Sequence, residues 1–316
     1  MENSEIKIVF IGTPEFGAIV LEGLINGGYK PILIVTAPDK PVGRKQIITP
    51  PPAKISAQKY NIPIIQPEKL SIIIDQLLSS KPDLIIVAGY REILPKEILE
   101  IPKYGCLNVH PSLLPKYRGP SPIQYAILNG DEETGVTIIK MVEKVDIGGI
   151  IGSIKYEVGS RKITSKELEK ELAELGAKLL METIPKWVKG KIKPQPQDES
   201  RAIYTKVLKR EDGKIDWKKS AEEIERQIRA FDPWPGSFTF FNSKNLKILK
   251  AGVLRQTEAG PFGLPGKTFL APNGKIAVQA GKDYLIIEEL QPEGKRKMTA
   301  EEFLRGHQDF IGVILK

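Results

Sequence analysis

The feature that most constrains the fold is a series of short, nearly continuous apolar runs, which occupy residues 6–11, 31–36 and 82–88. A run that is apolar at most positions, rather than at alternate ones, is typical of a strand buried on both faces of a parallel sheet. Helical apolar spacing separates the first two runs. Strand, helix and strand in succession predict a doubly wound α/β sheet, in which ligands bind beyond the carboxyl ends of the strands.

The turn after the first run, residues 12–17, contains Gly12 and Gly17 but lacks the middle glycine of the dinucleotide fingerprint. That glycine lets the backbone approach a pyrophosphate. Its absence disfavours an oxidoreductase that uses a nicotinamide dinucleotide. We interpret its glycines as residues that the backbone geometry of the turn requires, and the turn itself as one wall of a cleft.

Residues 37–52 are rich in proline and include Lys40, Arg44 and Lys45. A loop of this length in a compact domain is either functional or a solvated segment. The residues alone leave two interpretations open. The segment is a stiff, solvated insertion, or it is a basic finger beside the cleft whose cations face phosphates or bases.

A possible catalytic pair lies in residues 105–119, GCLNVHPSLLPKYRG. Asn108 and His110 alternate with apolar residues, which places both side chains on one face of a predicted strand. An imidazole moves protons near neutral pH, and an amide stabilises an oxyanion. The chain has two histidines, so His110 has little competition as a general base. A hydrogen-bonded structural histidine remains the alternative.

Asp146 stands between apolar neighbours and ahead of two glycines, in residues 142–149. Such an acid can orient an imidazole, as in catalytic triads, or it can simply cap a turn. The single cysteine, Cys106, excludes an intrachain disulfide and suits a packing role in a reducing compartment. The sequence has no cluster of Cys and His, so no metal site is expected.

The last third of the chain predicts a second domain. A long amphipathic helix over residues 165–187 precedes a proline-rich, polar segment that reads as a linker. A helix over residues 220–231 and several short strands separated by Gly and Pro follow, which favours a small β-barrel. The net charge of +8 suggests an anionic partner such as a phosphate backbone.

The N-terminal residues carry acids ahead of a short apolar run and do not resemble a signal peptide. No apolar run approaches the roughly 20 residues that cross a bilayer. We therefore expect a cytoplasmic protein with no membrane partner.

The string NVHPSLLPKYRG at residues 108–119 resembles the signature of the formyltetrahydrofolate-dependent formyltransferases. Several further segments are similar to the methionyl-tRNA formyltransferase branch of that family. They are FIGTPEF at 10–16, PDKPVGR at 38–44, PIQYAILNGD at 122–131, ETGVTI at 133–138, VDIG at 145–148, IDW at 215–217, IRAFDPWPG at 228–236 and FLRGH at 303–307. The resemblance covers nearly the whole chain.

The resemblance implies a Rossmann-like catalytic domain over residues 1–189, a linker over 190–206 and an OB-like barrel that binds tRNA over 207–316. It implies formyl transfer from 10-formyltetrahydrofolate to the methionine of initiator methionyl-tRNA, without a metal. We separately expect a monomer. The implied roles are oxyanion stabiliser for Asn108, general base and acid for His110, and orienting carboxylate for Asp146. His307 is expected to be structural.

Folate contacts implied by the resemblance fall on two loops: Ser112, Leu113, Leu114 and Pro115, and Ala88, Tyr90, Ile93 and Leu94. The implied tRNA contacts fall on Lys40, Arg44 and Lys45. The sequence departs from the family pattern at Arg91, Glu92 and Ile147, which bears on the detail of the pterin pocket.

Three other functions compete with this one. A nucleotide-linked aminosugar or glycinamide ribonucleotide would use the same catalytic core with a different amine acceptor. An RNA-binding protein with a degenerate catalytic domain would not need Asn108, His110 and Asp146 together. A dinucleotide oxidoreductase would need the missing glycine. The basic segment at 38–50 and the basic C-terminal region favour tRNA.

Overall fold

The computed structural model describes residues 6–43, 45–256 and 263–316. The chain forms two compact units, each built from several segments. The first unit comprises residues 1–122, 132–159 and 167–206, and the second comprises residues 123–131, 160–166 and 207–316. The units differ from the predicted domain boundaries, because residues 190–206 belong with the first unit and two short segments before residue 189 belong with the second.

A seven-stranded sheet with the order β5-β2-β1-β6-β7-β8-β9 forms the centre of the first unit. The first five strands of this order are parallel, which confirms the doubly wound prediction, whereas β8 is antiparallel to both of its neighbours, β7 and β9. The strands are β1 (Ile8–Gly12), β2 (Leu33–Val35), β5 (Ile64–Ile65), β6 (Leu84–Ala88), β7 (Cys106–His110), β8 (Glu133–Lys140) and β9 (Ile150–Glu157).

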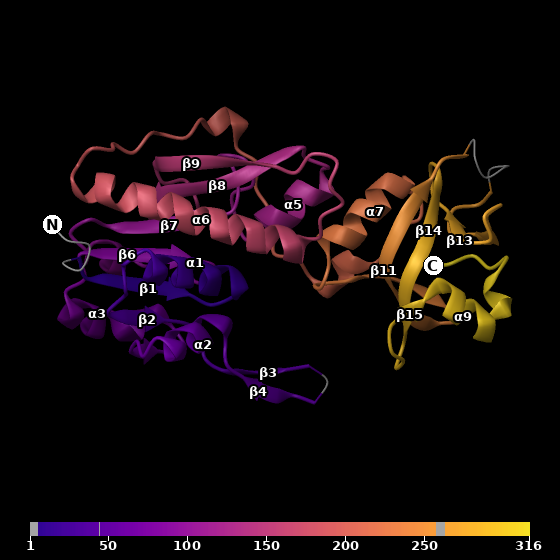
Figure 1. Ribbon diagram of the computed structural model, residues 1–316, viewed down its shortest axis with the longest axis horizontal. Coiled ribbons are helices and arrows are strands. Elements are labelled where there is room, and N and C mark those ends of the chain that lie inside the picture. The colour runs from indigo at the N-terminus through magenta and orange to yellow at the C-terminus, as the bar shows by residue number, and fades with distance from the viewer. Residues whose placement is uncertain (1–5, 44, 257–262) are drawn as a thin grey trace. The chain divides into compact units, whose positions relative to one another are not determined.

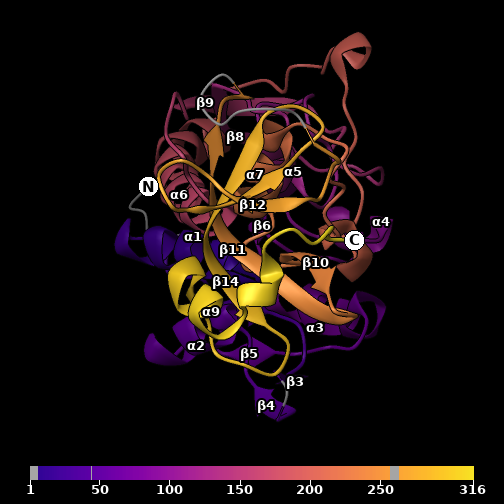
Figure 2. The same cartoon turned by 90° about the vertical axis from the view of Figure 1, so that its right-hand side faces the viewer.

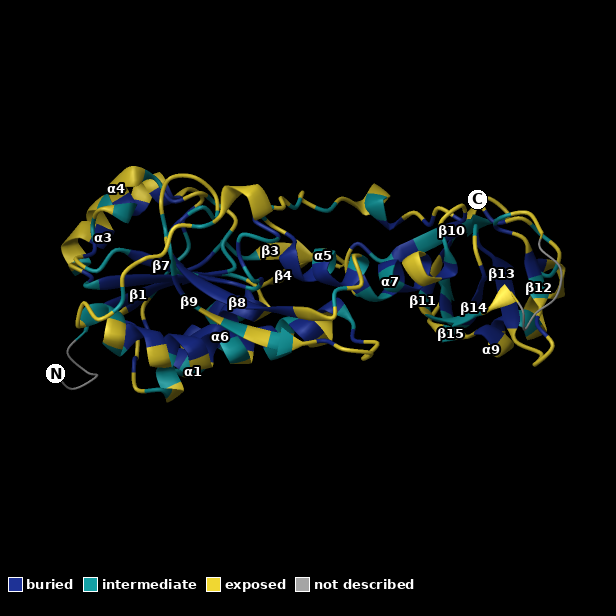
Figure 3. Ribbon diagram, turned by 90° about the horizontal axis from the view of Figure 1, so that it is seen from above, coloured by how far each residue is buried: buried dark blue, intermediate teal, exposed yellow. Residues whose placement is uncertain are grey.

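Helices cover both faces of this sheet. α1 (Glu15–Asn26) and α6 (Ser165–Val188) lie on one face, and α3 (Ile74–Ser80) and α4 (Lys96–Leu99) lie on the other (Figure 3). α2 (Pro52–Lys59) packs against α1, and the 3-10 helices η2 (Leu70–Ile73) and η3 (Glu199–Arg201) complete the unit. The sequence pattern missed α4, which has only four residues and follows Pro95.

The turn between β1 and α1 packs tightly on the end of β6. A Cβ atom added to either Gly12 or Gly17 would lie 2.6 Å from the carbonyl oxygen of Ala88. The amide of Thr13 donates a hydrogen bond to the carbonyl of Gly89 (3.1 Å). These glycines therefore allow the close approach of two chain segments, which accords with the geometric interpretation of the turn.

Residues 37–52 were expected to form an irregular loop, and this expectation is wrong in part. β3 (Lys40–Val42) and β4 (Ile47–Thr49) pair as an antiparallel hairpin that projects from the first unit (Figures 1 and 2). Val42, Ile47 and Ile48 are 56%, 61% and 61% exposed. The strand propensity of these β-branched residues outweighs the prolines, which pattern reasoning took as breakers.

The second unit is built on an antiparallel sheet with the order β10-β11-β14-β13-β12, and β15 pairs with β14. Its strands are β10 (Ser237–Phe241), β11 (Lys244–Leu254), β12 (Thr268–Leu270), β13 (Ile276–Gln279), β14 (Tyr284–Pro292) and β15 (Met298–Thr299). Its helices are α5 (Pro122–Leu128), η4 (Arg210–Gly213), α7 (Ala221–Ala230), α9 (Ala300–Gly306) and η5 (Gln308–Phe310). Sequence patterning missed β12 and the short β15.

The C-terminal segment joins the two edges of this sheet. The amide of Thr268 on β12 donates to the carbonyl of Val313 (2.9 Å), and the amide of Phe240 on β10 donates to the carbonyl of Lys316 (3.0 Å). The chain end lies beside β10 in Figure 2. Pairing at both edges closes the sheet on itself, which fits the expected barrel and protects its edge strands.

Candidate active site

Asn108, His110 and Asp146 come together at the carboxyl end of β7. The Nδ2 atom of Asn108 donates a hydrogen bond to Oδ1 of Asp146 (3.2 Å). Nδ1 of His110 lies 3.6 Å from Oδ2 of Asp146, and the two side chains are 5% and 12% exposed. The alternation along β7 puts the amide and the imidazole on one face of the strand, as the sequence predicted, and the fold brings the Asp146 carboxylate to both of them.

The second ring nitrogen of His110 is also held. Nε2 lies 3.0 Å from the carbonyl oxygen of Tyr117. A carbonyl oxygen only accepts, so Nε2 carries the proton in this contact, and the tautomer follows from it. Tyr117 is a buried residue with φ +63°, which is uncommon for a bulky side chain. In the neutral ring, Nδ1 is then the proton-accepting nitrogen and faces Asp146.

The carboxylate of Asp146 is held from two directions. The amide of Gly119 donates to Oδ2 (2.8 Å), besides the bond from Asn108 to Oδ1. Asp146 adopts φ +53° in the turn between β8 and β9. Nε2 of Gln197 donates to the backbone carbonyl of Asp146 (2.7 Å) and to that of Gly148 (2.8 Å). Asp146 is thus more than a turn cap.

The loop after β7, which carries four predicted folate contacts, is fixed by Thr137 of β8. Thr137 pairs with His110 across the sheet, and its Oγ1 donates to the carbonyl of Ser112 (2.7 Å). The amide of Leu114 donates back to the same Oγ1 (3.1 Å). Ser112 is buried, and its hydroxyl donates to the carbonyl of Lys116 (2.6 Å). Leu113 and Pro115 are half-buried on this loop.

The other four predicted folate contacts lie at or after the end of β6, the strand next to β7. Ala88 and Leu94 are buried, and Leu94 lies in the hydrophobic core of the first unit. Ile93 is exposed. Tyr90 is half-buried, and desolvation, aided by Glu92, raises its pKa to about 12. The structure brings the two loops to the same edge of the sheet, and the folate contacts themselves stay predictions.

The departures from the family pattern have local structural roles. The carboxylate of Glu92 accepts hydrogen bonds from the amide of Leu70 (3.1 and 3.0 Å), so it supports the start of η2. Arg91 is exposed and Ile147 is half-buried. Glu92 therefore stabilises the sheet edge rather than adding an unpaired charge to it.

The predicted tRNA contacts lie on the hairpin of β3 and β4. Lys40 and Lys45 are exposed there, and Arg44 lies outside the described residues. His307, in contrast, stacks on Phe303 in the second unit with ring centroids 4.4 Å apart, and it meets Phe241 edge-on. These contacts are those of a structural residue, as the sequence analysis expected.

Sequence reasoning missed the residues that surround Arg118. This arginine is 0% exposed, and its guanidinium donates to Gln197, Glu199 and Tyr204 at 2.7–3.0 Å. The hydrogen bonds with Glu199 raise the pKa of Arg118 and lower the pKa of Glu199. Arg118 belongs to the signature string, but its partners lie in the segment expected to be a linker, where no local pattern marks them.

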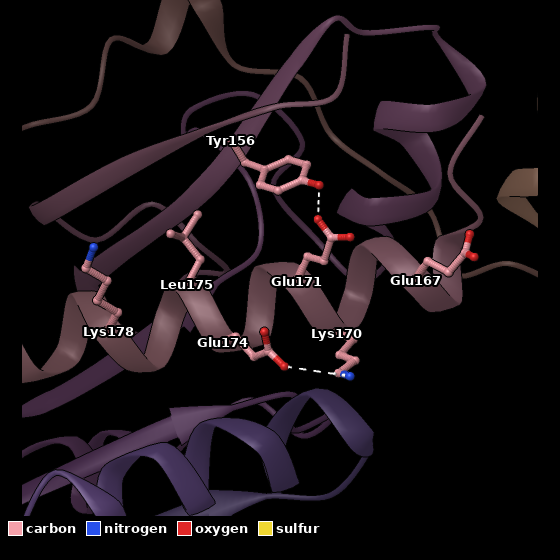
Figure 4. A pocket seen from close by; sticks show the side chains of 7 residues that line it. All are labelled: Tyr156, Glu167, Lys170, Glu171, Glu174, Leu175 and Lys178. Carbon is pink, nitrogen blue, oxygen red and sulfur yellow. Dashed lines mark hydrogen bonds and ion pairs between the residues drawn. The ribbon is translucent and has the colours of Figure 1, made fainter. Parts of the chain in front are cut away.

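Two further features carry no catalytic chemistry. Burial raises the pKa of the Cys106 thiol to about 12, which suits packing. A surface hollow of about 720 Å³ lies between β9 and α6, where Tyr156 meets Glu171 and Lys170 pairs with Glu174 (Figure 4). Within the described ranges, no group of three or more His, Cys, Asp or Glu side chains is arranged to hold a metal, and no helix is long and apolar enough to cross a membrane.

Comparison with known proteins gives matches over both units. Residues 6–184 match the formyl transferase family, and residues 207–308 match the C-terminal domain of formyl transferases. The methionyl-tRNA formyltransferase of Bacillus velezensis is 48% identical over 312 residues, which cover 98% of this chain and 97% of that protein.

Solved structures share the fold at lower identity. The methionyl-tRNA formyltransferase from Clostridium thermocellum has a TM-score of 0.54 at 21% identity, over 90% of this chain and 99% of that one. HypX from Aquifex aeolicus in complex with tetrahydrofolic acid has a TM-score of 0.65 at 18% identity. The match covers 96% of this chain and 47% of HypX, so this chain spans about half the length of HypX. The matches over both units and the near full-length relative together establish that the chain belongs to the formyl transferase family.

Proposed function

We propose that this protein transfers the formyl group of 10-formyltetrahydrofolate to the α-amino group of methionine on initiator methionyl-tRNA, for translation initiation. The observation that carries the proposal is the convergence of Asn108 and His110 on the Asp146 carboxylate. The near full-length relative named methionyl-tRNA formyltransferase supports the choice of acceptor.

Asn108 stabilises the intermediate. The amine attacks the formyl carbon, a carbon–nitrogen bond forms, and the carbonyl oxygen becomes an oxyanion. One N–H of the Asn108 amide is committed to Asp146, which fixes the plane of the amide. We assign the second N–H to the oxyanion. A fixed donor of this kind is worth about 10²–10³ in kcat in other acyl-transfer enzymes.

His110 moves the proton. His110, directly or through water, takes the proton of the attacking amine. It then returns this proton to the folate nitrogen as the bond between that nitrogen and the formyl carbon breaks. The negative charge of Asp146, 3.6 Å away, stabilises the imidazolium that exists between the two transfers.

The acceptor is held by basic surfaces. The β3–β4 hairpin presents Lys40 and Lys45 to solvent beside exposed apolar side chains, a combination suited to phosphates and bases. Arg44 is the third cation of this proposal. Residues 206–316 hold 20 Lys and Arg against 15 Asp and Glu, which adds a weak electrostatic attraction to tRNA. We also infer that the protein acts as a cytoplasmic monomer.

The test is formyl transfer to charged initiator methionyl-tRNA, with charged elongator methionyl-tRNA alongside. The expected result is transfer to the initiator alone. His110→Ala should abolish transfer while tRNA affinity is kept, and His307→Ala, at the exposed histidine of the second unit, is the matched control that should retain it. Wild-type rates in the His110 variant would refute the assignment of the base. Transfer to neither tRNA would leave an aminosugar nucleotide or glycinamide ribonucleotide as the acceptor to test.

A further inference from the structure

The segment that follows α6 is hydrogen-bonded to the loop that follows β7. The amide of Arg118 donates to the carbonyl of Ile203, and the amide of Thr205 donates to the carbonyl of Arg118 (both 2.8 Å). Gly119 lies so close to this segment that a Cβ atom there would sit 2.9 Å from the Thr205 carbonyl oxygen. Residues 197–205 are therefore part of the scaffold of the site.

Gln197 links this scaffold to the Asp146 turn through both ends of its amide. Oε1 accepts from Nε and Nη2 of Arg118 at 3.0 and 2.9 Å. A guanidinium only donates, so the orientation of the amide is fixed, and Nε2 must point at the carbonyls of Asp146 and Gly148. Arg118 is in turn held by both carboxylate oxygens of Glu199 at 2.7 and 2.9 Å.

The Asp146 turn needs such support. Residues 142–145 of the turn are exposed, and Asp146 has a positive φ, a conformation that costs free energy in a non-glycine residue. The hydrogen bonds of Asn108 and Gly119 hold the carboxylate, whereas those of Gln197 hold the backbone that carries it. A shift of about 1 Å in a group of this kind can cost 10²-fold in rate.

We propose that Gln197 is a positioning residue for formyl transfer, which holds the Asp146 turn so that its carboxylate meets His110 and Asn108. Arg118 and Glu199 anchor Gln197 and act through it. This inference rests on the proposed function of the same site and adds to it a residue outside the signature string.

The experiment uses the full chain with Gln197→Glu. Glutamate keeps the length of the side chain and an acceptor for Arg118, and it removes both N–H donors. We expect kcat for formyl transfer to fall about 10- to 100-fold, with the KM for 10-formyltetrahydrofolate and for tRNA within about twofold of wild type. Gln197→Met removes the amide without adding charge and should give the same loss.

The matched control is Gln195→Glu. Gln195 is exposed, lies two residues earlier on the same segment, and its side chain donates to the carbonyl of Lys193 (3.3 Å). This variant carries the same added charge and should keep the kcat of wild type. A rise in KM with unchanged kcat in both Gln197 variants would overturn the proposal, as would wild-type kinetics.

A double variant tests whether Gln197 affects kcat through the Asp146 carboxylate. In an Asp146→Asn background, Gln197→Glu should change kcat by less than about twofold, because the carboxylate that Gln197 positions is already gone. A further 10-fold loss would show that Gln197 acts elsewhere and would overturn the inference. Absence of formyl transfer by the wild-type protein would instead refute the proposed function, and this inference with it.

Discussion

Thr137 offers a sharp test of how the loop after β7 is held, because its hydroxyl makes two hydrogen bonds to that loop. The side chain is 0% exposed, its Oγ1 donates to the carbonyl of Ser112 (2.7 Å), and it accepts from the amide of Leu114 (3.1 Å). Thr137→Val replaces the hydroxyl with a methyl group of similar shape. It therefore removes both hydrogen bonds with little change in packing volume.

The expected loss of stability is about 2–4 kcal/mol. Two hydrogen bonds contribute about 1–3 kcal/mol together, and the buried carbonyl and amide that they leave without a partner add to the cost. For a unit of this size, the melting temperature should fall by roughly 4–16 °C. Calorimetry measures this shift directly. Ile138→Val, on the next residue of β8, removes one buried methylene and should cost only about 0.5–1.5 kcal/mol.

The two variants should also differ in function. Thr137→Val frees the segment that carries Ser112 and Leu114, so the KM for 10-formyltetrahydrofolate should rise severalfold at a temperature where the protein is folded. Ile138→Val should leave that KM unchanged. A Thr137→Val protein whose free energy of unfolding stays within about 0.5 kcal/mol of wild type would refute the reasoning, because buried groups left unpaired must cost more.

Three further predictions concern groups outside this loop. Lys45→Ala on the hairpin should weaken tRNA binding and reduce the slope of log affinity against log salt by about one, whereas Lys30→Ala, at an exposed lysine elsewhere, should not. The Cys106 thiol, with a pKa of about 12, should resist thiol reagents in the native protein at pH 8 and react once the protein is unfolded. Desolvation raises the pKa of Glu169, so wild-type stability falls as the pH rises from the unfolded-state pKa through the higher native one. Calorimetry should therefore show a higher melting temperature for Glu169→Gln at pH 7, and the advantage should vanish at about pH 4.

The parts of the fold that the sequence predicted well are those set by local apolar pattern. The runs at 6–11 and 82–88 became β1 and β6, and the amphipathic stretch at 165–187 became α6. The hairpin at 40–49 was missed, because its prolines read as breakers while its pairing depends on contacts between the two strands. The hydrogen bonds by which the C-terminal segment closes the second sheet could not be predicted either, because they join residues far apart in sequence.

The residues of the candidate site also fall into two groups, those that the local sequence pattern predicted and those whose contacts depend on the fold. Asn108 and His110 lie two residues apart on one strand, so alternation alone predicts that their side chains share a face. Asp146 was named from its glycine-rich turn, although its contact with both required the fold. Gln197 could not be predicted, because it lies in a polar, proline-rich segment and its role depends on Arg118, 79 residues away.

Two residues with strained backbone conformations lie on either side of the His110 imidazole. The orientation of the ring is therefore set by the whole site rather than by β7 alone. Tyr117 and Asp146 both have positive φ, and each presents an acceptor to one ring nitrogen of His110. Conformations of this kind cost about 1–3 kcal/mol and persist only where surrounding contacts over-determine them. For Asp146 those contacts come from Gly119 and from Gln197, on segments outside β7. A strand end alone would leave the ring free to rotate, whereas the Tyr117 carbonyl opposite Nε2 and the Asp146 carboxylate opposite Nδ1 fix the plane of the ring and the direction of both nitrogens.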